Sequence, residues 1–271
     1  MNHLQSLAAR YGMREARAIY MLVMEQRFGL TVTQVLLGKD RELSADERHE
    51  LDIITARLLE GEPVQYVLGE CSFRGHDFHV EPGVLIPRPE TAQLVALIVQ
   101  EAQPGLRVLD IGTGSGCIGV SLALEGMLVT ALDISPDALR IASANATRMQ
   151  ADVQFVQGDI LHPTACSHMW DIIVSNPPYI RHCEAADMNV NVLEHEPHTA
   201  LFVPDDDPLL FYRAIGRFAQ EHLTAKGTLW LEINRDFPQQ TCHLLEGMGY
   251  AQVQAMQDSY GNYRFVKAIH T

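Results

Sequence analysis

The sequence RVLDIGTGSGCIG, residues 107–119, contains an apolar run that is followed directly by closely spaced glycines. The run at 107–111 is typical of a buried strand, and the apolar residues after Gly116 favour a helix. Glycine has no Cβ atom, so a glycine loop between a strand and a helix lets the backbone approach a ligand at the carboxyl edge of a sheet. The stretch therefore predicts an α/β fold with a ligand site at this loop.

The sequence around this loop repeats the alternation of strand and helix. Apolar strand patterns follow at 128–134, 153–156, 171–175, 227–233, 250–257 and 264–270. Helical patterns precede the first strand and lie between later ones, including one capped by Ser135 with Pro136 at its first position, and others over 208–223 and near 238–248. Strands that alternate with helices indicate a parallel sheet that is covered on both faces.

The first 60 residues carry a helical pattern without a strand signal. Ser44 and Glu47 fit a capping box ahead of a second apolar helix, and Gly61 ends that run. An earlier helical face is made by Ala16, Ile19, Tyr20, Val23 and Met24. This part of the sequence therefore predicts a small all-helical domain.

Two short segments connect the helical part to the α/β part. ECSFRGHDFHVE, residues 70–81, predicts a hairpin that turns near Arg74 and Gly75. PGVLIPRPET, residues 82–91, contains three prolines and a glycine, which predicts a stiff, irregular linker. We therefore expect a helical bundle over 1–69, the hairpin and linker over 70–91, and the α/β domain over 92–271.

The composition of the chain excludes several classes of protein. Its 271 residues are 47% hydrophobic and 20% charged, as in an ordinary globular protein. The five cysteines are scattered without a CxxC pair, which favours reduced thiols over disulfides or a zinc site. No apolar run approaches the ~18 residues of a membrane span, and the first residues lack the apolar core of a signal peptide. We expect a cytoplasmic protein that does not bind membranes.

The charge of the chain argues against a general nucleic-acid binder. Residues 1–80 carry 9 basic and 12 acidic side chains, net −3, and residues 81–271 carry 11 and 22, net −11. A protein that binds a duplex replaces phosphate counterions with a basic surface. We therefore expect no stable binding of nucleic acid.

The glycine loop fits two cofactor patterns. Gly114, Gly116 and Gly119 match the G-x-G-x-x-G fingerprint of dinucleotide-binding proteins. Gly112, Gly114 and Gly116 match the denser D-x-G-x-G-x-G pattern of S-adenosylmethionine-dependent methyltransferases. Each match is weak by itself, and the loop could also be a tight turn without a ligand.

Two carboxylates follow the next strands in the chain. Asp133 ends the second strand, where a carboxylate can accept both ribose hydroxyls of either cofactor. Asp159, after the third strand, can accept the amino group of an adenine while Ile160 packs on the ring. This second feature favours an adenosine-containing cofactor, although an ordinary turn aspartate would look the same in the sequence.

The stretch VSNPPYI, residues 174–180, places an unusual set of acceptors after the fourth strand. Asn176 precedes a proline and is biased to extended backbone, and neither Pro177 nor Pro178 has an N–H group. The Asn176 side-chain oxygen and the Pro177 carbonyl can converge on the two donors of a planar NH2 group, with Tyr179 against the face of that group. Two acceptors would favour the pyramidal nitrogen of a methyl-transfer transition state and aim its lone pair.

Five motifs together resemble the peptide-chain release factor glutamine methyltransferase family. They are PGVLIPRPET (82–91), LDIGTGSGCI (109–118), VSNPPYI (174–180), EHEPHTAL (194–201) and DSYGNYRFV (258–266). The helical residues 1–60 resemble the N-terminal bundle of the same family. The resemblance thus covers nearly the whole chain, and its most specific part is the proline-rich linker together with Asn-Pro-Pro-Tyr-Ile.

The resemblance implies a function in translation termination. It implies methyl transfer from S-adenosyl-L-methionine to the side-chain amide nitrogen, N5, of the glutamine in the Gly-Gly-Gln motif of class 1 peptide-chain release factors. It also implies a Rossmann-like seven-stranded methyltransferase fold whose last strand is antiparallel, with a small N-terminal helical domain that docks the protein substrate.

The resemblance also implies the roles of individual residues. Asn176, Pro177 and Tyr179 would be catalytic, and Asn176 to Tyr179 would bind the substrate glutamine with support from Arg88 and Glu90. The residues implied to bind the cofactor are Gly112, Thr113, Gly114, Ser115, Gly116, Asp133, Asp159, Ile160 and Asn176. No metal is implied. The spacing of a helical zinc site is absent from the run Glu194, His195, Glu196 and His198, which also lies beside Pro197.

The chain departs from the family pattern at Gln93, where a third acidic residue is frequent, and at Asn234, where glycine is frequent. Three rival functions share part of this pattern. An adenine-N6 nucleic-acid methyltransferase would use the same Asn-Pro-Pro-Tyr but needs a basic groove. A nicotinamide enzyme would leave that motif without a role. A binding protein without activity would not need the acceptors at 176 and 177.

Overall fold

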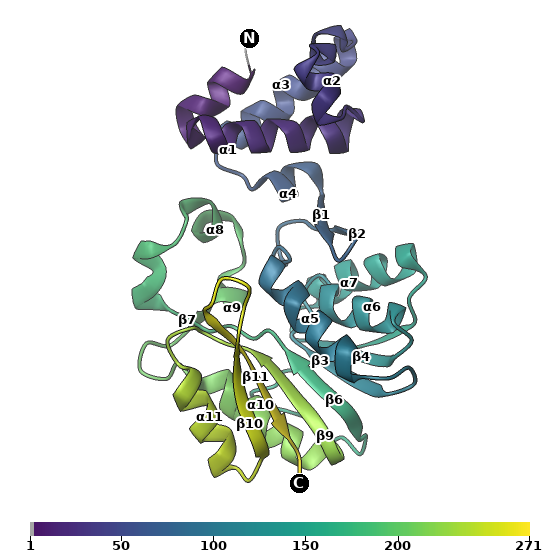
Figure 1. Cartoon of the computed structure of the whole chain (residues 1–271), viewed down its shortest axis with the longest axis vertical. Helices are drawn as coiled ribbons and strands as arrows, with labels where there is room; N and C mark the ends of the chain where they lie inside the picture. Colours follow the sequence, from purple (N-terminus) through teal and green to yellow (C-terminus); the bar gives the residue numbers. More distant parts are fainter. Residues whose placement is uncertain (1–2) are drawn as a thin grey trace. The chain divides into compact units, whose positions relative to one another are not determined.

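A computed structural model describes residues 3–271 of the chain. The chain divides into two compact units, which are described separately (Figure 1). The smaller unit comprises the residues up to Glu70 together with Asn189–His195, and the larger unit comprises Cys71–Met188 and Glu196–Thr271. No helix within residues 3–271 is both long enough and apolar enough to cross a bilayer.

The smaller unit is helical, as the sequence predicts. Its elements are α1 (His3–Phe28), α2 (Val32–Leu36), the 3-10 helix η1 (Lys39–Glu42), α3 (Ala45–Leu59), α4 (Val64–Leu68) and α8 (Val190–His195). The Ser44 side chain caps α3 and Glu47 completes the predicted capping box. The helical face predicted within residues 16–24 is buried in the core of this unit, against apolar residues of α3. The burial of these faces holds the bundle together.

The hairpin and the linker lead into the larger unit. Strands β1 (Glu70–Phe73) and β2 (His76–His79) are joined through Arg74 and Gly75, which both have positive φ angles of 50° and 79°. The prediction of irregular backbone through residue 91 was wrong for its last three residues, because helix α5 (Pro89–Glu101) begins at Pro89. Proline is favourable at the first position of a helix, where its missing N–H costs nothing.

The larger unit is built on a seven-stranded sheet with the strand order β10-β11-β9-β6-β3-β4-β5. The strands are β3 (Arg107–Ile111), β4 (Leu128–Asp133), β5 (Val153–Gln157), β6 (Trp170–Ser175), β9 (Leu223–Glu232), β10 (Ala251–Gln257) and β11 (Tyr263–Ile269). Strand β11 pairs antiparallel with both of its neighbours, whereas β9, β6, β3, β4 and β5 are mutually parallel. The predicted Rossmann-like methyltransferase fold with an antiparallel last strand is confirmed.

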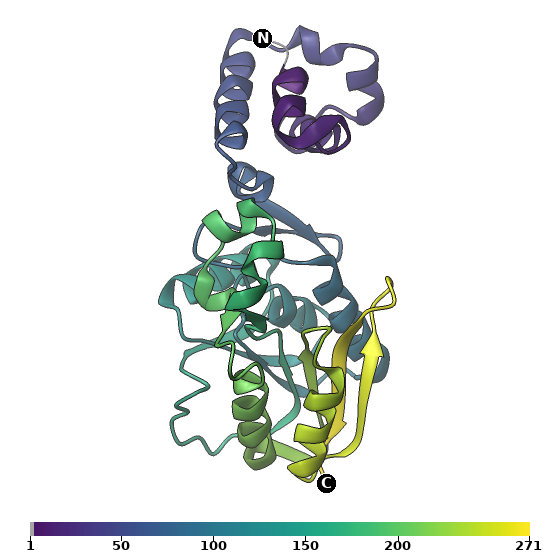
Figure 2. The same ribbon diagram turned by 90° about the vertical axis from the view of Figure 1, so that its left-hand side faces the viewer.

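Helices cover both faces of this sheet. Helices α5, α6 (Cys117–Leu124) and α7 (Pro136–Met149) pack on one face, and α10 (Leu210–His222) and α11 (Pro238–Gly247) pack on the other (Figures 1 and 2). Neighbouring residues of one strand serve different cores: Val108 faces the first set of helices and Leu109 the second. This alternation is the period-2 pattern of a strand that is buried on both faces.

A long connection between β6 and α10 carries short elements that have no periodic signal in the sequence. Besides α8, these are β7 (Ile180–Arg181), the 3-10 helix η2 (His182–Asp187), α9 (His198–Leu201) and β8 (Phe202–Val203). β7 pairs in parallel with β8, so the connection folds back on itself beside the end of β6. This arrangement brings residues 197–204 to the same edge of the sheet as the glycine loop.

Candidate active site

A cavity of about 450 Å³ opens at the carboxyl edge of the parallel strands. Its wall comes from segments that follow β3, β4, β5 and β6, from the proline-rich linker, and from residues 197–215. A volume of this size suits a small-molecule cofactor. The fold thus gathers the predicted glycine loop, Asp133, the Asp159–Ile160 pair and Asn176 around one space.

The glycine loop reaches the cavity in a conformation that other residues rarely adopt. Gly112 and Gly114 line the cavity with φ angles of 73° and 55°, and a Cβ atom on either would point into open space. Gly116 has a different role, since a Cβ atom there would lie 3.0 Å from the Cβ atom of Ala142 in α7. Two glycines therefore keep space free on the cavity side, and the third permits close packing of helices.

The buried side chain of Asp110 holds the glycine loop through hydrogen bonds. Oδ2 of Asp110 accepts hydrogen bonds from the Thr113 hydroxyl at 2.6 Å and from the Gly119 N–H at 3.0 Å. Its Oδ1 has no hydrogen-bond partner among the described residues. Burial raises the pKa of Asp110 to about 7. No role for Asp110 is predicted from the sequence, although its place as the penultimate residue of β3, directly before the glycine loop, is a signal for such support.

Asp133 is the last residue of β4, contacts the loop that follows β3, and lies in the wall of the cavity. Its Oδ2 accepts the N–H of Gly114 at 2.9 Å, and its Oδ1 accepts the N–H of Ser135 at 2.9 Å. Burial raises the pKa of this carboxyl group, while those backbone N–H donors oppose the shift. Each carboxylate oxygen has a second lone pair, so the group retains capacity to accept ligand hydroxyls.

Asp159 and Ile160 form the part of the wall that follows β5. The Asp159 carboxylate accepts the N–H of Leu161 at 2.8 Å and contacts the His162 ring, whose hydrogen bond lowers the pKa of Asp159. Ile160 is buried and presents an apolar surface to the cavity. An acceptor and an apolar surface therefore lie beside each other, as a purine ring requires.

Asn176, Pro177 and Pro178 line the cavity, whereas Tyr179 and Glu90 do not. The Asn176 side-chain nitrogen donates to the Thr91 hydroxyl at 3.2 Å. The Tyr179 hydroxyl donates instead to the Glu232 carboxylate at 3.2 Å, behind the cavity wall. Glu90 lies in the first turn of α5. The cavity wall thus includes Asn176 and both prolines of the motif, whereas the Tyr179 hydroxyl is bound to Glu232 outside that wall.

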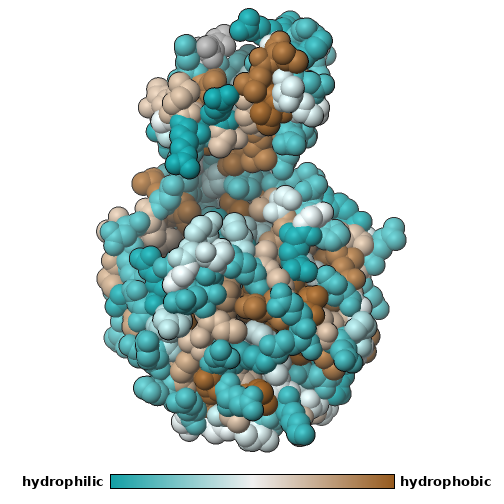
Figure 3. Space-filling view, viewed as in Figure 1, coloured by the Kyte–Doolittle hydropathy of each residue, from teal (hydrophilic) through white to brown (hydrophobic). Residues whose placement is uncertain are grey.

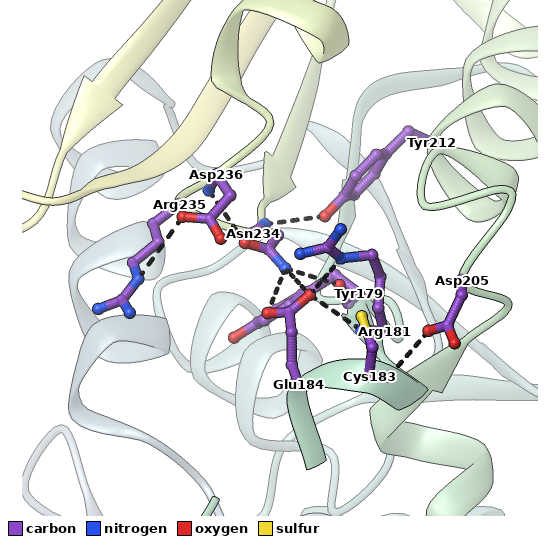
Figure 4. A network of polar contacts seen from close by, with 9 residues as sticks. All are labelled: Tyr179, Arg181, Cys183, Glu184, Asp205, Tyr212, Asn234, Arg235 and Asp236. Atoms are coloured by element: carbon purple, nitrogen blue, oxygen red, sulfur yellow. Dashed lines mark hydrogen bonds and ion pairs between the residues drawn. The ribbon is translucent and has the colours of Figure 1, made fainter. Parts of the chain in front are cut away.

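Asn234 fixes the backbone of the motif, and Figure 4 shows the network around it. Its side-chain nitrogen donates to the Tyr179 carbonyl at 3.0 Å and to the Glu184 carboxylate at 3.3 Å. Its backbone N–H donates to the hydroxyl of Tyr212, which is buried in α10. Asn234 is one of the two departures from the family pattern, and here it connects the end of β9 to the segment after Pro178.

Arg88 lines the cavity and pairs with Glu196, whose side chain is 1% exposed. Glu196 also accepts the N–H of Ile86 at 3.1 Å. One carboxylate therefore holds the proline-rich linker against the segment that carries Pro197. In the sequence, Glu196 stands out only as part of a run that resembles metal ligands. No group of three or more His, Cys, Asp or Glu side chains that could hold a metal occurs among residues 3–271.

Comparison with known proteins adds to this geometry. The sequence profile of the Methyltransferase small domain matches residues 89–201, and that of the PrmC N-terminal domain matches residues 2–69. The chain is 44% identical over 267 residues to a release factor glutamine methyltransferase of Bacteroides thetaiotaomicron, covering 97% of this chain and 96% of that protein. It is 40% identical to the protein of that name from Flavobacterium psychrophilum, over 97% and 95% of the two chains.

Solved structures support the fold. A methyltransferase from Pyrococcus furiosus superposes with a TM-score of 0.55 at 18% identity, over 79% of this chain and 96% of that one. A 16S rRNA methyltransferase from T. thermophilus, solved in complex with AdoMet and guanosine, gives a TM-score of 0.55 at 21% identity, over 74% and 50%. At these identities the likeness concerns the fold alone.

Proposed function

This chain belongs to the release factor glutamine methyltransferase family, and from that premise we propose the chemistry of its cavity. The chain transfers a methyl group from S-adenosyl-L-methionine to the side-chain amide nitrogen of the glutamine in the Gly-Gly-Gln motif of class 1 peptide-chain release factors. The observation that carries this proposal is the joint placement of Asn176, Pro177 and the glycine loop in one cavity wall.

We propose that the cofactor lies along the glycine loop. The open space on the cavity side of Gly112 and Gly114 supports this placement, together with the neighbouring Thr113 and Ser115 in the same wall. Asp133 would accept the ribose hydroxyls, while Asp159 and Ile160 would take the adenine. When bound, the cofactor supplies a methyl group on a positively charged sulfur.

The substrate glutamine would place its NH2 group between Asn176 and Pro177. The Asn176 oxygen and the Pro177 carbonyl each accept one N–H, which turns the nitrogen lone pair away from its own carbonyl group. The nitrogen would accept the methyl group from the cofactor, whose sulfur would leave as a neutral thioether, and the methylated nitrogen would release one proton to water. Arg88, held by Glu196, would shape the entrance beside the linker.

We also propose that the helical unit docks the release factor. Three apolar residues of and beside α2 are exposed, Val32 by 48%, Leu36 by 61% and Leu37 by 78%, and Figure 3 shows apolar residues on the surface of this unit. Exposed apolar patches often mark binding sites for proteins. The net charge of −14 favours a protein partner over nucleic acid, and a partner in translation favours a cytoplasmic location.

The cofactor proposal predicts a selective thermal shift. S-adenosylmethionine and S-adenosylhomocysteine should raise the melting temperature of the protein, because a ligand that binds only the native state stabilises it by mass action. At a hundredfold excess over the dissociation constant, this stabilisation amounts to about 2.7 kcal/mol. NAD at the same concentrations should leave the melting temperature unchanged. A shift with NAD and none with S-adenosylmethionine, in a fluorescence melting assay, contradicts the proposal.

The docking proposal predicts a difference between large and small substrates. Leu37→Glu should lower kcat/KM for a whole release factor by roughly fivefold or more, the effect of losing about 1 kcal/mol at an interface. The same variant should methylate a free Gly-Gly-Gln peptide at the wild-type rate. Leu128→Glu, at a 60% exposed apolar residue of the larger unit, is the matched control. Equal losses of kcat/KM with both substrates would contradict docking and would assign the helical unit a structural role only.

A further inference from the structure

The carboxylate of Glu232 lies directly behind the Asn-Pro-Pro-Tyr motif. Glu232 is the last residue of β9, its exposed fraction is 1%, and β9 pairs in parallel with β6. In that pairing Ser175 is opposite Leu231, so the next residues along the two strands, Asn176 and Glu232, emerge side by side at the carboxyl edge. Glu232 itself is absent from the cavity wall, so any influence on the substrate passes through other residues.

Both oxygens of Glu232 accept hydrogen bonds from hydroxyl groups. The Thr91 hydroxyl donates to Oε2 at 2.8 Å, and the Tyr179 hydroxyl donates to Oε1 at 3.2 Å. Thr91 is 2% exposed and lies in the first turn of α5. An isolated buried carboxylate is costly, and these two donors offset part of that cost.

The Thr91 hydroxyl has a single hydrogen, which it donates to Glu232. Its oxygen is therefore available only as an acceptor towards Asn176, and the Asn176 Nδ2 atom lies 3.2 Å from it. An amide side chain carries its nitrogen and its oxygen on opposite branches. With Nδ2 directed at Thr91, the acceptor Oδ1 is the branch left free for a ligand in the cavity that Asn176 lines.

The same strand end also holds Tyr179. Its hydroxyl donates to Glu232. Its carbonyl accepts the Asn234 side-chain nitrogen at 3.0 Å, and Figure 4 shows this second contact. Glu232 and Asn234 are separated by one residue. The motif is thus held at Asn176 through Thr91, and at Tyr179 through both its side chain and its backbone.

We propose that Glu232 is a positioning residue for methyl transfer, which orients the Asn176 amide through the Thr91 hydroxyl so that Oδ1 faces the methyl acceptor. This inference rests on the proposed function of the cavity. Burial raises the pKa of Glu232 to about 7, while the Arg264 charge opposes that shift. In its ionised form the carboxylate can only accept hydrogen bonds, so both hydroxyls donate to it and the chain of bonds has one direction. A glutamine at position 232 has the same shape but can donate, which permits the reverse direction and a rotated Asn176 amide.

The test compares three substitutions in the full-length protein by single-turnover methylation of a release factor at saturating S-adenosylmethionine. Thr91→Val and Glu232→Gln should each lower the rate by about tenfold or more, the effect of losing roughly 1.4 kcal/mol of orientation. Thr91→Ser keeps the hydroxyl and should stay within about threefold of wild type, because that group alone carries the effect. The affinity for S-adenosylhomocysteine should change by less than about threefold in all of them, since the proposed cofactor contacts at residues 112–116, 133 and 159–160 are unchanged.

Thr241→Val is the matched control for a lost buried hydroxyl. Thr241 is fully buried in α11 and donates to the Phe237 carbonyl at 2.8 Å, outside the cavity wall. The Thr241→Val protein should be less stable than the wild type, while its folded fraction should methylate the release factor at the wild-type rate. In the double variant, Glu232→Gln should lower the methylation rate by a smaller factor than it does in the wild-type background. The reason is that both substitutions interrupt the same chain of hydrogen bonds.

Three results would overturn the inference. They are wild-type rates in both Thr91→Val and Glu232→Gln, an equal loss in Thr91→Ser and Thr91→Val, and effects that add fully in the double variant. If the wild-type protein itself does not label the release factor, the proposed function fails instead, so the two failures are distinguishable. If the Glu232→Gln protein does not fold, the comparison of the methylation rates of Thr91→Val and Thr91→Ser still tests the inference.

Discussion

Asn176→Ala is expected to lower the single-turnover rate of methyl transfer by about 10²–10³-fold, the loss typical of one preorganised transition-state hydrogen bond. The substitution removes the amide that lies in the cavity wall between Pro177 and Thr91. It leaves both prolines and the glycine loop in place. The affinity for S-adenosylmethionine should fall much less, because the other proposed contacts come from residues 112–116, 133 and 159–160.

Two measurements separate the effects of this substitution. Cofactor affinity is measured by calorimetry, and transfer is measured in a single turnover with enzyme in excess. Asn176→Asp is the companion variant, since it keeps an acceptor of the same size but adds a negative charge and removes the donor to Thr91. It should retain a small activity above that of Asn176→Ala. If Asn176→Ala transfers methyl at nearly the wild-type rate with unchanged affinity, Asn-Pro-Pro-Tyr is only a turn.

Asp133→Ala is expected to weaken the binding of S-adenosylmethionine by about 1.5–3 kcal/mol, or roughly 10- to 150-fold, as when a hydrogen bond to a charged group is lost. Asp133 lies in the cavity wall and also holds the N–H groups of Gly114 and Ser135. The substitution therefore removes the proposed ribose acceptor and loosens the loop that lines the cofactor side. Calorimetric titration with S-adenosylmethionine and S-adenosylhomocysteine measures the loss.

Asp133→Asn separates the two contributions, because it keeps one side-chain oxygen for the loop and removes the charge. Its affinity for S-adenosylmethionine should lie between that of the wild type and that of Asp133→Ala. The rate at saturating cofactor should change far less than the affinity in both variants. An unchanged affinity in Asp133→Ala would show that the ribose lies elsewhere.

The central strands of the sheet could be predicted because they are apolar runs. Strands β3 and β6 have buried residues on both faces, whereas buried residues alternate with partly buried ones along β4. The predicted start of helix α5 is three residues late, because Pro87 precedes the helix, Pro89 is its first residue, and proline usually indicates irregular backbone. Elements as short as β7 and α9 have too few residues to show any period.

The front of the site could also be predicted, since Asp133 and Asn176 directly follow strands and such ends meet at one edge of a parallel sheet. The residues that support the site through Asn176 and Tyr179 could not be predicted in this way. Thr91 and Glu232 are 141 positions apart in the chain, and only the pairing of β6 with β9 and the packing of α5 bring them together. Glu196 was overlooked for the same reason, because its partner Arg88 is 108 positions away.

The position of the transferred methyl group tests the account most directly. The full-length protein is incubated with S-adenosylmethionine and either a class 1 release factor, the same factor with its Gly-Gly-Gln glutamine replaced by alanine, or duplex DNA. Peptides and nucleosides are then analysed by mass spectrometry. The account predicts one added methyl group on the side-chain amide of that glutamine, and none on the substituted factor or on adenine. Methylation of adenine, or of the release factor at any other residue while its glutamine stays unmodified, would contradict it.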